Sequence, residues 1–167
     1  IIAGNDFGYI KISELPIRSI ALSKNGDRLV AACHDGNIFI IEINNSANKS
    51  DEILKVIFSF KAHDNAILKC VISPDNNFFV TTSADSTAKL WDFSTYKQKS
   101  TLKSDQKKWV WDASFTKDSK FVVTGGSDNY IRTWDVSTGE NIYSRELTKC
   151  GITALTVFYI KNKENIH

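Results

Sequence analysis

The sequence has little proline and glycine, no methionine, and no block of charge of one sign. Two prolines and eight glycines in 167 residues, with 42% hydrophobic residues, exclude a disordered or low-complexity chain. The 21 basic and 19 acidic side chains leave a formal net charge of +2, which argues against a role on nucleic acid or a membrane surface that depends on bulk charge. We therefore expect one folded domain with a single core.

Long apolar runs and paired cysteines are also absent. The most apolar stretch, 152–160, is interrupted by threonines and is far shorter than the roughly 20 residues of a membrane span. Cys33, Cys70 and Cys150 are widely spaced and form no motif for zinc or redox chemistry. Because no phosphate-binding loop or metal-ligand spacing occurs either, we expect no cofactor and no metal, and buried thiols in a reducing compartment.

What the chain does contain is an internal repeat. The segments SPDNNFFVTTSADSTAKLWDF, from Ser73, and TKDSKFVVTGGSDNYIRTWDV, from Thr116, share a polar turn, an apolar strand, small residues, an aspartate, and a strand ending in Trp-Asp. Their Trp-Asp pairs begin 43 residues apart. A third copy starts at Ser23, with Ile41 and Glu42 at the Trp-Asp positions. The chain is therefore a tandem array of one structural unit.

Each repeat consists of short β-branched and aromatic runs between turn residues, which is typical of antiparallel strands. In the middle repeat these runs predict strands over 67–72, 78–83, 88–93 and 98–102. The repeats divide the chain into the end of one unit at 1–15, whole units at 17–60, 62–102 and 105–147, and the first strand of a further unit at 152–160. The predicted fold class is all-β.

Four-stranded repeats that end in Trp-Asp resemble the WD-repeat family of β-propellers, whose blades pack face to face around a channel. Since propellers have roughly four to eight blades, we expect this chain to cover three to four blades of a longer protein with about seven. The resemblance implies a buried structural network in one blade, formed by His63, Ser83, Asp85 and Trp91. It also marks further signature positions of the blades at Asp35, Asp92, Asp128, Trp134 and Asp135.

The third repeat departs from the family pattern at two of the network positions. It has Asp105 where the histidine is expected and Gly126 where a serine or threonine is expected. His63, Asp85 and Ser83 are also the residue types of a hydrolytic triad. Because the neighbouring repeat lacks the histidine, and no oxyanion hole is indicated, we interpret the three as structural and expect no enzyme activity.

Within this family, one blade carries a more specific pattern. Trp109-Val110-Trp111-Asp112, followed by a small residue, Ser-Phe and a Lys-Asp-Ser turn, resembles the later blades of the G-beta-like WD-repeat subunits of target-of-rapamycin (TOR) kinase complexes. This resemblance implies a scaffold that binds and stabilises the kinase domain, located in the cytoplasm or peripherally on endomembranes through the complex. The alternative is another interaction module, such as a ubiquitin-ligase substrate receptor or a peptide reader.

The two tryptophans of this pattern are the main candidates for contact with a protein partner. Trp109 and Trp111 share strand parity and project to one side of their sheet, with Trp109 nearer the rim and expected to be exposed. Exposed aromatic residues at a rim are typical hot spots of binding. Trp111 either joins this surface or fills the space between blades. Lys107, Asn129 and Tyr130 lie in neighbouring loops and complete the predicted partner-binding set.

Overall fold

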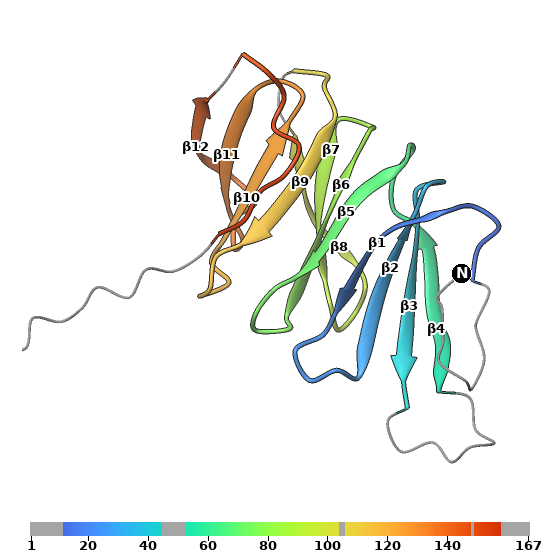
Figure 1. Cartoon of the computed structure of the whole chain (residues 1–167). Coiled ribbons are helices and arrows are strands. Elements are labelled where there is room, and N and C mark those ends of the chain that lie inside the picture. Colours follow the sequence, from blue (N-terminus) through green and yellow to red (C-terminus); the bar gives the residue numbers. More distant parts are fainter. Residues whose placement is uncertain (1–11, 45–52, 104–105, 148, 158–167) are drawn as a thin grey trace, which may run out of the picture.

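The computed structural model describes residues 12–44, 53–103, 106–147 and 149–157 (Figure 1). In these ranges the chain forms three four-stranded antiparallel sheets, each a meander in chain order. No helix in the described ranges has the length and apolar character needed to cross a membrane. The predicted all-β class and the predicted four-stranded units are confirmed.

The strands have closely similar lengths in the three sheets. The first sheet contains β1 (Ile17–Leu22), β2 (Arg28–Cys33), β3 (Asn37–Ile43) and β4 (Leu54–Lys61). The second contains β5 (Ile67–Ile72), β6 (Phe78–Ser83), β7 (Thr87–Asp92) and β8 (Gln98–Lys103). The third contains β9 (Val110–Phe115), β10 (Phe121–Gly126), β11 (Tyr130–Asp135) and β12 (Asn141–Glu146). The strands of the second sheet lie within one residue of their predicted bounds.

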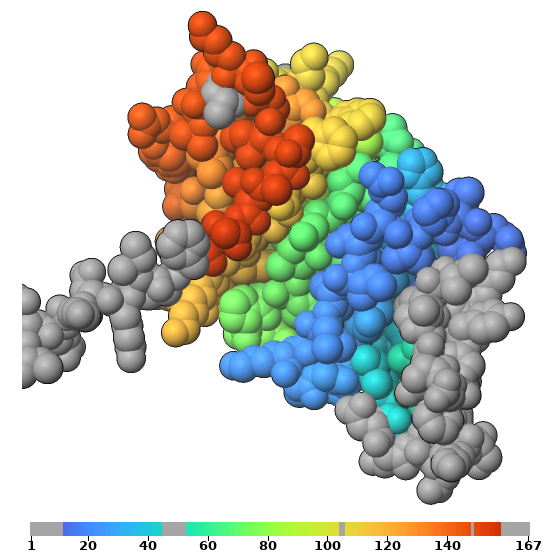
Figure 2. All heavy atoms as spheres, in the orientation of Figure 1, coloured from blue at the N-terminus to red at the C-terminus, as the bar shows by residue number. Residues whose placement is uncertain are grey.

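The sheets pack face to face and bury two apolar layers. Between the first and second sheets, Val30 and Ile40 meet Phe79, Trp91 and other buried side chains of the second sheet. A second layer joins the second and third sheets in the same way. The inner strands β1, β5 and β9 are neighbours, and Figure 2 shows them side by side across one face, in blue, green and yellow-orange. This stacking gives each blade a rigid support.

The strand predicted at 152–160 is not formed over the described residues 152–157, and the rest of that range lies outside the description. The segment instead crosses the third sheet beside its inner strands (Figure 1). The amide of Ile152 donates to the carbonyl of Gly126 at 2.9 Å, and the amide of Leu155 donates to Asp112 Oδ2 at 2.7 Å. Because Asp112 binds through its side chain, these contacts do not build the backbone ladder that defines a strand.

The end of a preceding blade, predicted at 1–15, falls mostly outside the described residues. Residues 12–15 form no strand. Ser13 lies close to the first sheet, with its Oγ 3.1 Å from Cys33 Sγ. This short segment therefore lies next to the end of β2 before β1 begins.

Candidate protein-interaction site

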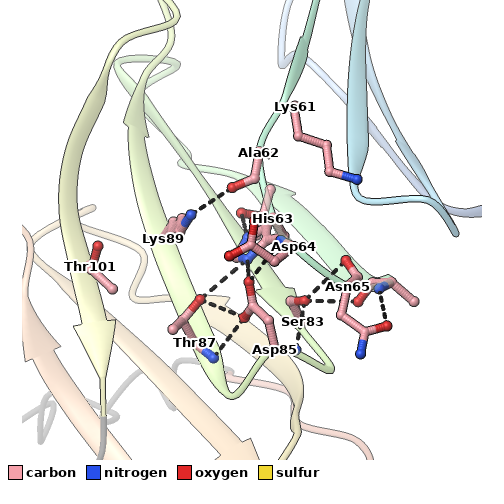
Figure 3. A network of polar contacts seen from close by, with 12 residues as sticks. Lys61, Ala62, His63, Asp64, Asn65, Ser83, Asp85, Thr87, Lys89 and Thr101 are labelled. Carbon is pink, nitrogen blue, oxygen red and sulfur yellow. Dashed lines mark hydrogen bonds and ion pairs between the residues drawn. The ribbon is translucent and has the colours of Figure 1, made fainter.

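The second sheet contains a buried hydrogen-bonded network centred on His63, in the loop between β4 and β5. Its Nδ1 lies 2.8 Å from Asp85 Oδ2, and its Nε2 lies 2.7 Å from Thr81 Oγ1. Trp91 Nε1 donates to the same Thr81 oxygen at 2.9 Å. Since a carboxylate only accepts, this pattern assigns the Nδ1 proton to the bond with Asp85 and makes the Thr81 hydroxyl the donor to Nε2. Figure 3 shows His63 and Asp85 pointing toward each other.

The prediction of Ser83 as the hydroxyl of this network is wrong, because Thr81 holds that position. Ser83 instead donates to the carbonyl of Ala66 at 2.9 Å and accepts from the amide of Asp85 at 3.0 Å. Residues two apart on a strand point to the same side of the sheet, so their spacing alone does not distinguish them. The pairing of β6 with its neighbours places Thr81, and not Ser83, opposite the imidazole.

In the third sheet the hydroxyl of the network also lies two residues before the predicted position, and the ion pair is a different one. Trp134 Nε1 donates to Thr124 Oγ1 at 2.8 Å, so the hydroxyl position expected at Gly126 is held by Thr124. Asp128 pairs with Arg132 through Oδ2 and Nη1 at 2.6 Å, and their side chains are only 4% and 13% exposed. Asp105, predicted at the histidine position, lies outside the described residues. A largely buried arginine thus pairs with Asp128, whereas the corresponding aspartate of the second sheet, Asp85, pairs with a histidine.

The signature aspartates act as turn residues. Asp35, Asp85 and Asp128 each accept the backbone amide of the residue two positions later, at 2.9, 2.9 and 3.2 Å. Asp92 and Asp135 accept amides in the turns that follow β7 and β11. Side-chain hydrogen bonding by Ser94 and the amide of Thr95 lower the pKa of Asp92 to about 2. These contacts explain why the second and third blades carry an aspartate at both turns.

The first sheet replaces the network with apolar packing. Ala31 and Ile41, at the positions of the threonine and the tryptophan, are fully buried. Its turn aspartate, Asp35, is retained. One blade therefore carries the full network, one carries a modified version, and one carries none.

The network predicts how stability depends on pH. Burial alone would raise the pKa of Asp85, but hydrogen bonds from His63 and Thr87 outweigh it and hold the pKa well below the ordinary value of 3.8. A carboxyl whose pKa is lowered by folding stabilises the protein in full above its unfolded pKa and loses that contribution as pH falls toward the folded pKa. We expect Asp85→Asn to flatten the loss of stability between pH 5 and pH 2, measured by urea denaturation at each pH.

The control for this experiment is Asp64→Asn, which removes one exposed negative charge from the same loop region. Equal changes in the acid dependence of the two variants would contradict the role assigned to Asp85.

Trp109 and Trp111 form a pair of rings at the start of β9. Trp109 is 46% exposed, and the two ring centroids are 5.2 Å apart with an interplanar angle of 59°. Trp111 is half-buried, and its Nε1 donates to Ser127 Oγ at 2.7 Å. The backbone amide of Ser127 donates to the carbonyl of Trp109 at 2.9 Å. The β10–β11 turn thus holds the Trp111 ring and the backbone of Trp109, and the exposed Trp109 ring packs against the ring of Trp111.

The other predicted contact residues lie in this loop region as well. Lys107 is exposed in the loop before β9, and Asn129 and Tyr130 are half-buried in the turn before β11 and at its first position. Asn129 has a positive φ of 72°, and its carbonyl accepts the amide of Leu147 at 3.1 Å. Sequence reasoning missed Arg132, whose guanidinium carbon lies 5.0 Å from the Tyr130 ring centroid. The sequence feature that could have identified Arg132 is Lys89, which is also cationic and holds the matching position in the second repeat.

Comparison with known proteins supports the assignment of the repeats. A family model described as "WD domain, G-beta repeat" matches residues 10–42, 54–92 and 96–135.

In the part of the chain that the structure describes, no group of three His, Cys, Asp or Glu side chains has the arrangement of a metal site.

Three curated relatives illustrate the range of similarity. A protein LST8 homolog of Drosophila pseudoobscura pseudoobscura is 36% identical over 59% of this chain and 31% of its own length. The target of rapamycin complex subunit LST8 of Saccharomyces cerevisiae is 38% identical over 45% of this chain and 24% of its own length. WD repeat-containing protein 1 of Gallus gallus is 34% identical over 46% of this chain and 12% of its own length.

The chain spans about a third or less of the length of these relatives. The family model matches all three repeats. Together with the three meander sheets and their Trp-centred cores, these matches show that the chain belongs to the WD40-repeat family of β-propellers.

Proposed function

We propose that this chain is part of a scaffold subunit of a TOR kinase complex, which binds and stabilises the kinase domain and carries out no chemistry of its own. The observation that carries the proposal is the Trp109–Trp111 pair at the rim of the third blade. The name of the yeast relative, a TOR complex subunit, supports the class of assembly. The proposal places the protein in the cytoplasm, or on endomembranes through its complex.

The geometry of Trp109 suits a protein contact. Nearly half of its surface is exposed, while its ring packs against the ring of Trp111, with the two centroids 5.2 Å apart. A large aromatic ring that is already fixed loses little conformational entropy on binding, which is why such residues dominate interface energies. The rim of a rigid blade is therefore a favourable place for a partner to dock.

The buried network supports the non-catalytic part of the proposal. His63 is only 1% exposed, and both of its ring nitrogens are engaged inside the blade. Ser83, the other member of the apparent triad, is fully buried. A hydrolytic nucleophile must meet substrate at an accessible site with an oxyanion hole, and these residues instead hold strands together.

The test is recovery of the kinase with tagged full-length protein from its own cells. We expect Trp109→Ala to reduce the recovered TOR kinase at least about tenfold, because truncating an interface hot spot costs about 2 kcal/mol or more. The melting temperature is expected to stay close to that of the wild type, since Trp109 is outside both apolar layers. Quantitative mass spectrometry and thermal unfolding provide the two readouts.

The matched control is Tyr143→Ala, which truncates an aromatic residue of similar exposure on the outer strand β12. It should leave kinase recovery unchanged. A loss of stability in Trp109→Ala that parallels the loss of binding would reassign this side chain to the core. Recovery of a ubiquitin-ligase adaptor or of chromatin proteins in place of the kinase would overturn the proposed function and favour the alternative interaction modules.

A further inference from the structure

The turn that follows β10 carries its hydroxyl group one residue later than the matching turn of the second sheet. β6 ends in Ser83 and is followed by Ala84, whereas β10 ends in Gly126 and is followed by Ser127. The backbones of the two turns correspond, because the amides of Ala84 and Ser127 each donate to the carbonyl of the residue directly before the inner strand, at 3.0 and 2.9 Å. The third blade thus differs from the second in the place of one side chain.

The two hydroxyl groups have different partners. Ser83 Oγ donates to the backbone carbonyl of Ala66 at 2.9 Å, whereas Ser127 Oγ accepts from Nε1 of Trp111 at 2.7 Å. Trp111 is the second residue of β9, and the second residue of β5 is Leu68. Leucine has no side-chain donor, so the second blade offers no such partner at this position. The displaced serine and the tryptophan that it binds therefore occur together, in the third blade.

Ser127 acts on both members of the tryptophan pair. Its hydroxyl group holds the indole ring of Trp111, and its amide holds the carbonyl of Trp109. Within the described ranges, Nε1 of Trp109 has no hydrogen-bond partner, so the orientation of this ring depends on packing. The ring of Trp111 is packed against it, with centroids 5.2 Å apart and an interplanar angle of 59°. A change in the orientation of Trp111 is therefore transmitted to the exposed ring.

We propose that Ser127 is a positioning residue of the partner-binding surface, which holds the Trp111 ring and, through it, the Trp109 ring in the orientation that a partner meets. The inference rests on the proposed function for the identity of the partner, and it adds the residue that prepares the surface. A side chain that already has its bound orientation loses less conformational entropy on binding. Without the hydroxyl group of Ser127, the Trp111 ring would lose its hydrogen bond and both rings would sample more orientations.

Circular dichroism measures the arrangement of the two rings directly. Indole rings that lie close together and are inclined to each other couple their electronic transitions, which gives two far-ultraviolet bands of opposite sign. In the full-length protein, we define the tryptophan-pair signal as the part of the spectrum that Trp109→Phe removes, measured in each Ser127 background. We expect Ser127→Ala to reduce this signal to about half or less, because a hydrogen bond shifts the populations of side-chain orientations severalfold. Ser127→Thr keeps the hydroxyl group and should retain most of the signal.

The matched control is Ser83→Ala, which removes the corresponding hydroxyl group of the second blade. It should lower stability but leave the tryptophan-pair signal unchanged, so a general loosening of the fold is distinguished from a loss of ring orientation. Three results would overturn the inference: an unchanged signal in Ser127→Ala, an equal reduction in Ser83→Ala, or a signal in Ser127→Thr no larger than that in Ser127→Ala.

Recovery of the TOR kinase with the tagged full-length protein connects ring orientation with binding. Ser127→Ala should lower recovery about threefold, which is less than the effect of Trp109→Ala because the exposed ring is still present. Wild-type recovery in Ser127→Ala, together with a loss in Trp109→Ala, would overturn the positioning role and leave the proposed function intact. Failure of the wild-type protein to recover the kinase would contradict the proposed function, whereas circular dichroism would still decide whether Ser127 orients the two rings.

Discussion

Thr81→Val is expected to destabilise the protein by about 2 to 3 kcal/mol, because it removes a buried hydroxyl that serves two partners. Valine has nearly the shape of threonine, so packing is retained while the hydrogen bonds are lost. His63 Nε2 would lose its donor and the indole N–H of Trp91 would lose its acceptor, both inside the blade. Urea denaturation of the wild type and the variant measures the difference in free energy of unfolding.

Two matched substitutions show whether the network, and not the hydroxyl alone, causes the effect. Thr124→Val removes a hydroxyl that accepts only from Trp134 among the bonds described, so about 1 kcal/mol is expected. Ser83→Ala tests the hydroxyl first predicted from the sequence. It should cost about 1 kcal/mol, because the carbonyl of Ala66 keeps the amide of Ala84 as a donor and only the amide of Asp85 loses its acceptor. If Thr81→Val were no more destabilising than these two, His63 would not depend on Thr81 as the geometry indicates.

Gly36→Ala is expected to destabilise the protein by about 3 kcal/mol or more, through strain and overpacking together. Gly36 has a positive φ of 86°, which is unfavourable for a residue with a Cβ. An added Cβ would overlap the carbonyl oxygen of His63 and lie 2.9 Å from that of Asn65. The carbonyl of Gly36 also accepts the amides of Ala62 and His63. The turn therefore cannot move away without disturbing the loop that positions the imidazole.

Gly26→Ala separates the two causes. Gly26 has a similar φ of 73°, but an added Cβ there would meet nothing within 4 Å. Only backbone strain remains, so a loss of about 1 kcal/mol is expected. Thermal and urea unfolding of both variants provide the comparison. Similar losses of stability in the two variants would mean that the loop of His63 moves away from an added Cβ at Gly36 at little cost in free energy.

The sequence by itself determined the repeating unit and the strands within it. Alternation of apolar residues, the turn aspartates and the Trp-Asp ends recur at a nearly constant spacing, and each is a local property of the chain. For the same reason the exposed position of Trp109 was predicted correctly, since it precedes a strand at the rim of a blade. The complete number of blades remains a prediction.

Only the tertiary structure decided which side chains meet across strands. Thr81 and Ser83 point to the same side of β6, and strand pairing alone places the first against His63. The Asp128–Arg132 pair and the path of residues 151–157 along the third sheet likewise depend on neighbours distant in sequence. Periodicity reports the side of a sheet on which a residue lies, whereas hydrogen-bond partners are set by register and packing between strands and blades.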